Sequence, residues 1–201
     1  MEKYDIIIIG GGVSGLSCAI TLGSAGSKLD VASDKKILVI DAGESHLNKA
    51  QLYNVAGITE GTKGPELLDF MVKQAKSYKN VTLLSGTVVS VTGTKDDFTI
   101  TTKSDDTFYA DIVVFANGMQ TIDVKGIDDL VVDHMRAPRP GMVMIKNDNG
   151  KISDGKYVTG CAAGVSSMFS TAAGYGAQTA TDIISTWAGK YTVVHDVLKK
   201  D

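Results

Sequence analysis

Three glycines near the start of the chain have the types and the spacing of a nucleotide-phosphate site. Gly10, Gly12 and Gly15 fit the pattern G-x-G-x-x-G. The first glycine permits a tight turn, the second lets backbone approach a pyrophosphate, and the third lets a helix pack closely on a strand. The first N–H groups of the helix, near Val13 and Ser14, would then face the phosphates. The motif therefore predicts a dinucleotide site.

The glycines carry this meaning only if a strand precedes them and a helix follows. The four isoleucines at 6–9 are typical of a strand that is buried on both faces of a parallel sheet. The apolar run 16–22 predicts the helix, and the polar stretch 23–35 is expected to be an extended loop after it. A second strand at 36–40 ends at Asp41, where an acid would meet a ribose hydroxyl of an adenosine.

Two alternatives stay open at this point. The first is an ordinary βαβ unit with a glycine turn and no nucleotide, because G-x-G-x-x-G alone is a weak signal. The second is an NAD-type site, because NAD and FAD share this fingerprint. The order of strand, glycines, helix, strand and acid favours a dinucleotide over none.

Composition bounds the class of protein. The chain has 201 residues, of which 43% are hydrophobic and 21% charged, which indicates one globular domain or at most two small ones. A net charge of -3 argues against nucleic acid or an anionic membrane as a partner. Two cysteines, Cys18 and Cys161, argue against a disulfide-stapled module and a zinc cluster, so no metal site is expected. The apolar start, 6–22, contains too many glycines and serines for a membrane span, and we expect a cytoplasmic protein.

The remaining chain predicts an α/β fold with a central parallel sheet, helices on its faces and a small antiparallel β-meander. The loop 42–58 follows the second strand, at the edge where such folds hold ligands. Beyond it we expect a helix at about 64–77, strands at 81–91, 98–102, 107–109 and 112–116, an irregular stretch at 121–140, short strands at 142–145 and 156–159, and a helix at about 170–187. Gly174 and Gly176 are costly inside that last helix, and a close approach to ligand or sheet would explain them.

Several separated stretches resemble the thioredoxin reductases and related FAD-dependent pyridine nucleotide-disulfide oxidoreductases. In that family the opening glycine turn is the FAD fingerprint. The segments 51–58 and 64–67 resemble its Gln…Glu-Asn-Phe-Pro-Gly…Gly-Pro-Glu-Leu stretch, and 86–91 resembles its G-x-V strand near adenine. The turn 116–118 resembles its Ala-Thr-Gly turn, and 158–161 resembles its closing Ala-Ala-Gly-Asp.

The resemblance implies a single Rossmann-like FAD-binding domain and FAD as the cofactor. Motif and resemblance together predict these cofactor-binding residues: Gly10, Gly12, Val13, Ser14, Gly15, Asp41, Ala42, Gly43, Gln51, Asn54, Val88, Ala116, Asn117, Gly118, Gly160, Cys161 and Phe169. By resemblance, the start of the last helix would face the pyrimidine ring of the flavin, where its dipole would stabilise the reduced form.

No catalytic residue is identified, and Cys161 and His46 are the weak candidates. Cys161 stands where the family has an aspartate that hydrogen-bonds a ribityl hydroxyl, and a thiol is a weak donor and a weak acceptor. It is either a thiol near the flavin, able to form an adduct or a disulfide, or a small apolar residue in a tight turn. His46 is either a proton donor over the nucleotide site or a solvated loop histidine.

Two parts of the full-length reductases are missing from the sequence: the inserted NADPH domain and the Cys-x-x-Cys pair. About 35 residues separate Gly118 from Ser153, fewer than the ~100 of a typical domain. We therefore expect one domain over 1–201, with FAD segments 1–118 and 153–190 joined by a short irregular linker, 119–152.

This arrangement implies an FAD-dependent oxidoreductase that takes electrons from free NADH or NADPH, a thiol or a separate electron-donor protein. The alternative is a non-catalytic or regulatory FAD- or nucleotide-binding module that has lost redox activity. A homodimer is also predicted, since removing a domain from this architecture should expose apolar surface.

Overall fold

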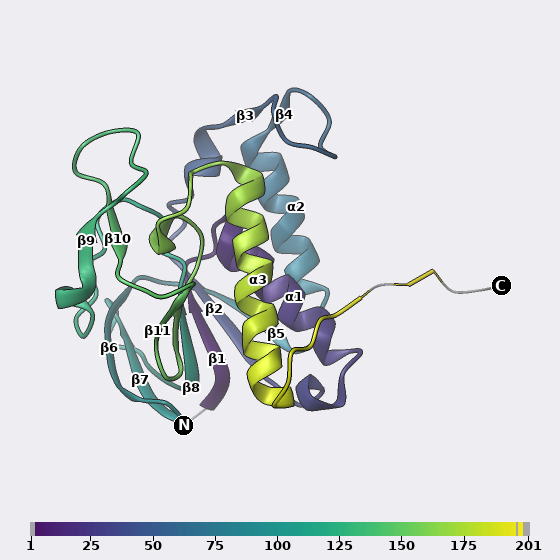
Figure 1. Cartoon of the computed structure of the whole chain (residues 1–201), viewed down its shortest axis with the longest axis vertical. Coiled ribbons are helices and arrows are strands. Elements are labelled where there is room, and N and C mark those ends of the chain that lie inside the picture. Colours follow the sequence, from purple (N-terminus) through teal and green to yellow (C-terminus); the bar gives the residue numbers. More distant parts are fainter. Residues whose placement is uncertain (1–2, 196, 199–201) are drawn as a thin grey trace.

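The computed structural model describes residues 3–195 and 197–198. Three α-helices lie on one side of a sheet, and a smaller β-structure lies on the other side (Figure 1). The helices are α1 (Val13–Gly26), α2 (Gly64–Lys76) and α3 (Phe169–Ala188), with short 3-10 helices η1 (Asp30–Ala32), η2 (His46–Lys49), η3 (Asp128–Leu130) and η4 (Gly160–Ala163). The strands are β1 (Lys3–Ile9), β2 (Ile37–Asp41), β3 (Gln51–Leu52), β4 (Thr62–Lys63), β5 (Val81–Ser85), β6 (Val88–Thr94), β7 (Asp97–Thr102), β8 (Thr107–Phe115), β9 (Val131–Asp133), β10 (Val143–Ile145), β11 (Lys151–Ser153) and β12 (Lys156–Val158).

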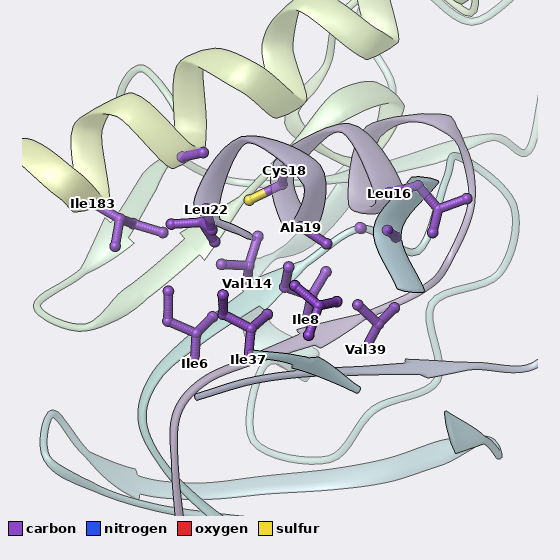
Figure 2. Packing of buried hydrophobic residues seen from close by; sticks show 14 of the residues in the cluster. Ile6, Ile8, Leu16, Cys18, Ala19, Leu22, Ile37, Val39, Val114 and Ile183 are labelled. Carbon is purple, nitrogen blue, oxygen red and sulfur yellow. The ribbon is translucent and has the colours of Figure 1, made fainter. Parts of the chain in front are cut away.

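The central sheet has the order β11-β12-β8-β1-β2-β5. Strand β1 lies in the middle and pairs in parallel with β2 and with β8, as its buried isoleucines predict. Its side chains alternate between the two faces, so Ile6 and Ile8 pack under the helices while Ile7 and Ile9 pack against the meander. Cys18 is fully buried on the helix side, beside Leu22 in Figure 2, which confirms it as a core residue.

The helices cover one face of the sheet only, whereas the sequence predicted helices on both. The other face is covered by β6 and β7, because the first half of β8 pairs antiparallel with β7 while its second half pairs in parallel with β12. The predicted strands at 107–109 and 112–116 are therefore one strand. The predicted strand at 81–91 is instead two strands, β5 and β6, and Gly86 lies in the connection between them.

Helix α1 continues into the stretch that was expected to be a loop. It ends at Gly26, and η1 follows. Glycines allow this close packing, since a Cβ atom on Gly23 would lie 2.7 Å from the Tyr78 ring and one on Gly26 would lie 2.5 Å from Asn80 Nδ2. The glycines in this stretch therefore serve helix packing and do not indicate a loop.

Helix α3 lies directly against α1. A Cβ atom on Gly176 would lie 2.2 Å from the backbone oxygen of Ser14, whereas one on Gly174 would meet nothing within 4 Å. A close approach does explain Gly176, although its neighbour is α1 and not a ligand or the sheet. This contact fixes the two helix N-termini relative to each other.

The connection 119–152, expected to be irregular, carries regular structure and is tied to η4. Strand β10 pairs with β9, whereas β12 pairs with β8 and β11. Three side chains of the connection bond backbone oxygens next to or within η4: His134 Nε2 to Cys161 (2.9 Å), Arg136 Nη1 to Gly164 (2.7 Å) and Asn147 Nδ2 to Ala163 (3.2 Å).

The loop after β2 also contains regular structure, namely η2 and the hairpin of β3 and β4. Within the described ranges, no helix has the length and apolar character needed to cross a membrane.

Candidate functional site

A cavity of about 580 Å³ lies at the carboxyl ends of β1, β2 and β8. It is bounded by the N-termini of α1 and α3 and by the loop after β2. Of the residues predicted to bind a cofactor, these line it: Gly10, Gly12, Val13, Ser14, Asp41, Ala42, Val88, Ala116, Asn117, Gly118, Cys161 and Phe169. Residues from far apart in the sequence thus meet at one edge of the sheet, as the strand pattern predicts.

The turn after β1 has the geometry that the glycine spacing predicts. Gly10 has a φ of 110°, which favours glycine, and a Cβ atom on Gly15 would lie 1.9 Å from the Gly10 oxygen. Gly12 is different, because the nearest atom to its Cβ position is Ser45 Oγ at 3.5 Å, and it lines the cavity. The first and third glycines therefore hold strand and helix together, while the second leaves the helix start open.

No side chain caps the N-terminus of α1. The first N–H groups of a helix have no acceptor within the helix, so those of Val13 and Ser14 are available to a ligand at the cavity wall. Such a site attracts an anion, and the positive end of the helix dipole adds to the attraction.

The charges around the cavity make these N–H groups the main anion-binding feature. The lining contains the carboxylates of Asp41, Glu44 and Asp123 and no lysine or arginine. Asp41 Oδ1 accepts a hydrogen bond from the Gly11 backbone N–H at 2.8 Å, which leaves Oδ2 for a ligand. A bound diphosphate would be held by backbone dipoles, with a carboxylate acceptor close by for a hydroxyl.

The two weak catalytic candidates both line the cavity. His46 is exposed at the start of η2. Cys161 is half-buried in η4, where burial raises the pKa of its thiol and a hydrogen bond from its own backbone lowers it, burial being the larger effect. At neutral pH this cysteine is a thiol and a poor nucleophile.

The start of α3 supplies an apolar wall. Phe169 and Val13 pack against the small cluster of Leu47, Leu52 and Leu67 from η2, β3 and α2. Four of these five side chains line the cavity, Leu67 being the exception. No side chain caps α3 either, so apolar surface and unpaired N–H groups meet at this end.

Five predicted residues are not brought to the cavity. Gln51 and Asn54 are exposed near the β3–β4 hairpin, where Gln51 Nε2 donates to the Gly61 oxygen at 3.2 Å. Gly43 is exposed outside the lining. Gly15 and Gly160 are packing residues, and a Cβ atom on Gly160 would lie 2.3 Å from Ser14 Oγ.

The sequence interpretation missed one whole wall of the cavity, formed by the segment 119–124. This segment leads into Lys125, whose N–H donates to the Val89 oxygen of β6 at 3.0 Å. Met119, Ile122 and Val124 are buried, and apolar and polar residues alternate at 122–124. That alternation is a signal that could have identified an ordered segment. The lining residues outside the predicted set are Ile9, Ile40, Glu44, Ser45, Leu47, Ala50, Leu52, Gly86, Thr87, Ser167, Met168 and Ala172. Gly86 and Thr87 belong to the segment that the resemblance placed near adenine, and Met168 lies at the helix start that it placed near the flavin.

The residues present fit a dinucleotide such as FAD. Gly12 leaves room for a diphosphate beside unpaired N–H groups, Asp41 has an oxygen free for a ribose, and Phe169 belongs to an apolar wall. Asn117 Oδ1 is buried without a hydrogen-bond partner and lines the same cavity. Among the described residues, no group of three or more His, Cys, Asp or Glu side chains could hold a metal ion.

Comparison with known proteins places this geometry in a family. The profile described as pyridine nucleotide-disulphide oxidoreductase matches residues 4–142. The chain is 32% identical over 135 residues to a ferredoxin–NADP reductase of Leuconostoc mesenteroides, a match that covers 65% of this chain and 40% of that protein. A ferredoxin–NADP reductase of Lactiplantibacillus plantarum is 30% identical over 116 residues, which are 58% of this chain and 34% of that protein. The matches thus span well under half the length of these relatives.

Solved structures share the fold. A thioredoxin reductase from Gloeobacter violaceus matches with a TM-score of 0.76 and 13% identity, covering 99% of this chain and 100% of that chain. An oxidoreductase from Agrobacterium tumefaciens matches with a TM-score of 0.73 and 16% identity, covering 94% of this chain and 100% of that chain. These likenesses confirm the predicted Rossmann-like fold. The chain belongs to the pyridine nucleotide-disulphide oxidoreductase family.

Proposed function

We propose that the chain holds FAD in the cavity at the ends of β1, β2 and β8 and acts as an FAD-dependent oxidoreductase. The observation that carries this proposal is the uncapped N-terminus of α1, which opens on the cavity through Gly12. FAD when bound would supply the electron-transfer chemistry, and the chain's residues would bind it, orient it and exclude water.

Each part of the cavity has a role in this proposal. The backbone N–H groups of 12–14 hold the diphosphate, whose charge is offset by the helix dipole because no lysine or arginine lines the cavity. Asp41 accepts a hydrogen bond from the adenosine ribose. Val13 and Phe169 limit access of water to the ring system.

The source of electrons is free NADH or NADPH, a thiol or a separate donor protein. The relatives named ferredoxin–NADP reductase support a nicotinamide or a protein donor. An internal dithiol is not part of this proposal, since Cys18 is buried in the core while Cys161 lines the cavity. We also propose one FAD-binding domain over 1–201, a homodimer and a cytoplasmic location, on the composition and motifs described above.

Reconstitution with FAD followed by anaerobic reduction tests the proposal. After removal of free flavin, the protein should retain FAD in a one-to-one ratio by absorbance. NADH, NADPH, dithiothreitol and a reduced ferredoxin are then added separately, and at least one should bleach the flavin band. A protein that retains no FAD would refute the binding site.

The second candidate function is a non-catalytic or regulatory FAD-binding module. The observation that favours it is the state of Cys161, whose pKa is raised by burial and which has no second cysteine beside it in the cavity lining. FAD that is bound one-to-one but bleached by none of the four reductants would support this function over the first.

A further inference from the structure

One polar atom at the cavity wall has no hydrogen-bond partner within the protein. Asn117 follows the end of β8 and lines the cavity, and its Oδ1 is buried and unpaired. A buried acceptor without a hydrogen-bond partner destabilises a protein, and most buried polar atoms in native structures have a partner. An unpaired oxygen at the wall of a ligand cavity therefore indicates a donor that the ligand supplies.

The strand order identifies which part of a dinucleotide lies over Asn117. The glycine turn follows β1, Asp41 ends the neighbouring β2 on one side, and Asn117 follows the neighbouring β8 on the other. A diphosphate at the end of β1 with its adenosine over β2 must extend its other half over β8 and β12. In FAD, the group attached to the diphosphate on that side is the ribityl chain, whose hydroxyls are hydrogen-bond donors.

The end of the neighbouring strand β12 does not offer an equivalent acceptor. Strand β12 lies beside β8, with Val158 opposite Phe115, so Cys161 follows the neighbouring strand end. Its thiol is a weak donor and a weak acceptor, and its backbone oxygen already accepts from His134 Nε2 at 2.9 Å. Thr159 Oγ1 is also buried and unpaired, but Thr159 does not line the cavity.

We propose that Asn117 recognises the ribityl chain of FAD, its Oδ1 accepting a hydrogen bond from a ribityl hydroxyl. Asn117 thereby takes a role that the thiol of Cys161 fills poorly. The inference rests on the proposed binding of FAD. It adds the residue that lets the site distinguish FAD from a ligand without a ribityl chain.

Isothermal titration of Asn117→Leu with two probes tests the assignment. FAD contains the ribityl chain, whereas ADP contains only the adenosine and diphosphate. Loss of one hydrogen bond should weaken FAD about tenfold, while the dissociation constant of ADP should stay within about twofold. Gln74→Leu is the control, because the Gln74 amide is exposed on α2 and outside the cavity lining, and both dissociation constants should be unchanged.

Thermal unfolding without ligand separates this role from a structural one. Leucine has the same branched arrangement of heavy atoms as asparagine and replaces an oxygen that bonds nothing, so the melting temperature of ligand-free Asn117→Leu should equal or exceed that of the wild type. If that variant does not fold, Asn117→Ala replaces it in the same titrations. A second change, Cys161→Asp, should restore FAD affinity to the Asn117→Leu variant, because it places a carboxylate acceptor at the neighbouring strand end.

Three results would overturn the assignment. FAD affinity unchanged in Asn117→Leu would show that no bond is made there. Equal weakening of FAD and ADP would place any contact in the shared half or attribute it to a structural change. A wild-type protein that binds ADP and FAD equally well would also refute recognition of the ribityl chain, whereas one that binds neither would refute the proposed function itself.

Discussion

Replacing Gly176 by alanine should force α1 and α3 apart. The new Cβ atom would lie 2.2 Å from the Ser14 backbone oxygen, and a relaxed contact needs about 3.5 Å, so the helices must separate by about 1.3 Å. The obstacle is backbone and cannot rotate away. Overpacking of this kind destabilises by about 2 to 3 kcal/mol, which for a chain of this size lowers the melting temperature by about 4 to 12 °C.

Gly174 is a matched control two residues away in the same helix. A Cβ atom there would meet nothing within 4 Å, so Gly174→Ala should gain about 1 kcal/mol from helix propensity and raise the melting temperature by ~2–4 °C. Differential scanning calorimetry should show a lower melting temperature for Gly176→Ala and a higher one for Gly174→Ala than for the wild type. Equal melting temperatures for Gly176→Ala and the wild type would refute the close packing of α3 on α1. This packing fixes the relative positions of the two helix N-termini at the cavity.

Three further predictions concern the cavity itself. Gly12→Val should fold normally, because Gly12 has φ -77° and ψ -166°. The valine methyl groups would block the helix N-terminus, so the affinity for FAD, measured by isothermal titration, should fall at least about hundredfold. An unchanged affinity would contradict the diphosphate site. Since burial raises the pKa of Cys161, iodoacetamide should alkylate it more slowly at pH 7.5 than it alkylates cysteine in solution, and the rate should increase as the pH rises. Bound FAD should slow the alkylation of Cys161 further. Cys18, which is buried, should stay unmodified in the native protein. Mass spectrometry follows both sites, and equal Cys161 rates with and without FAD would place the ligand elsewhere. Asp41→Ala removes both the Gly11 N–H acceptor and the ribose partner, and should weaken FAD and ADP by a similar factor of about ten or more; a loss confined to FAD would contradict the adenosine half lying over β2.

The first 41 residues could be predicted well because their signals are local. Strand β1, the glycine turn, α1 and the acid at the end of β2 lie close together in sequence, and each has a direct physical requirement for its residue type. The interpretation of 23–35 as a loop, which was based on its polar composition, was wrong at 23–26, where α1 continues, and at η1. Gly23 in fact permits α1 to pack on Tyr78, a contact between residues far apart in sequence.

The walls of the cavity were harder to predict, since they depend on pairing across the sheet. Strand 81–91 divides at Gly86 because β5 pairs with β2 while β6 pairs with β7, and β-branched residues are equally suited to both pairings. The segment 119–124 is held in place by backbone bonds of Lys125 to β6, and in the sequence only the short alternation at 122–124 indicates its order. Gln51 and Asn54 matched a family pattern, but a match in residue type does not fix the direction of the hairpin that carries them.

A crystal structure of the protein grown with excess FAD tests the central claim most directly. The account predicts density for the diphosphate within hydrogen-bonding distance of the backbone N–H groups of 12–14, with the ribose at Asp41 and the flavin half over the ends of β8 and β12. Flavin bound elsewhere, or no density at the N-terminus of α1 under saturating FAD, would contradict it.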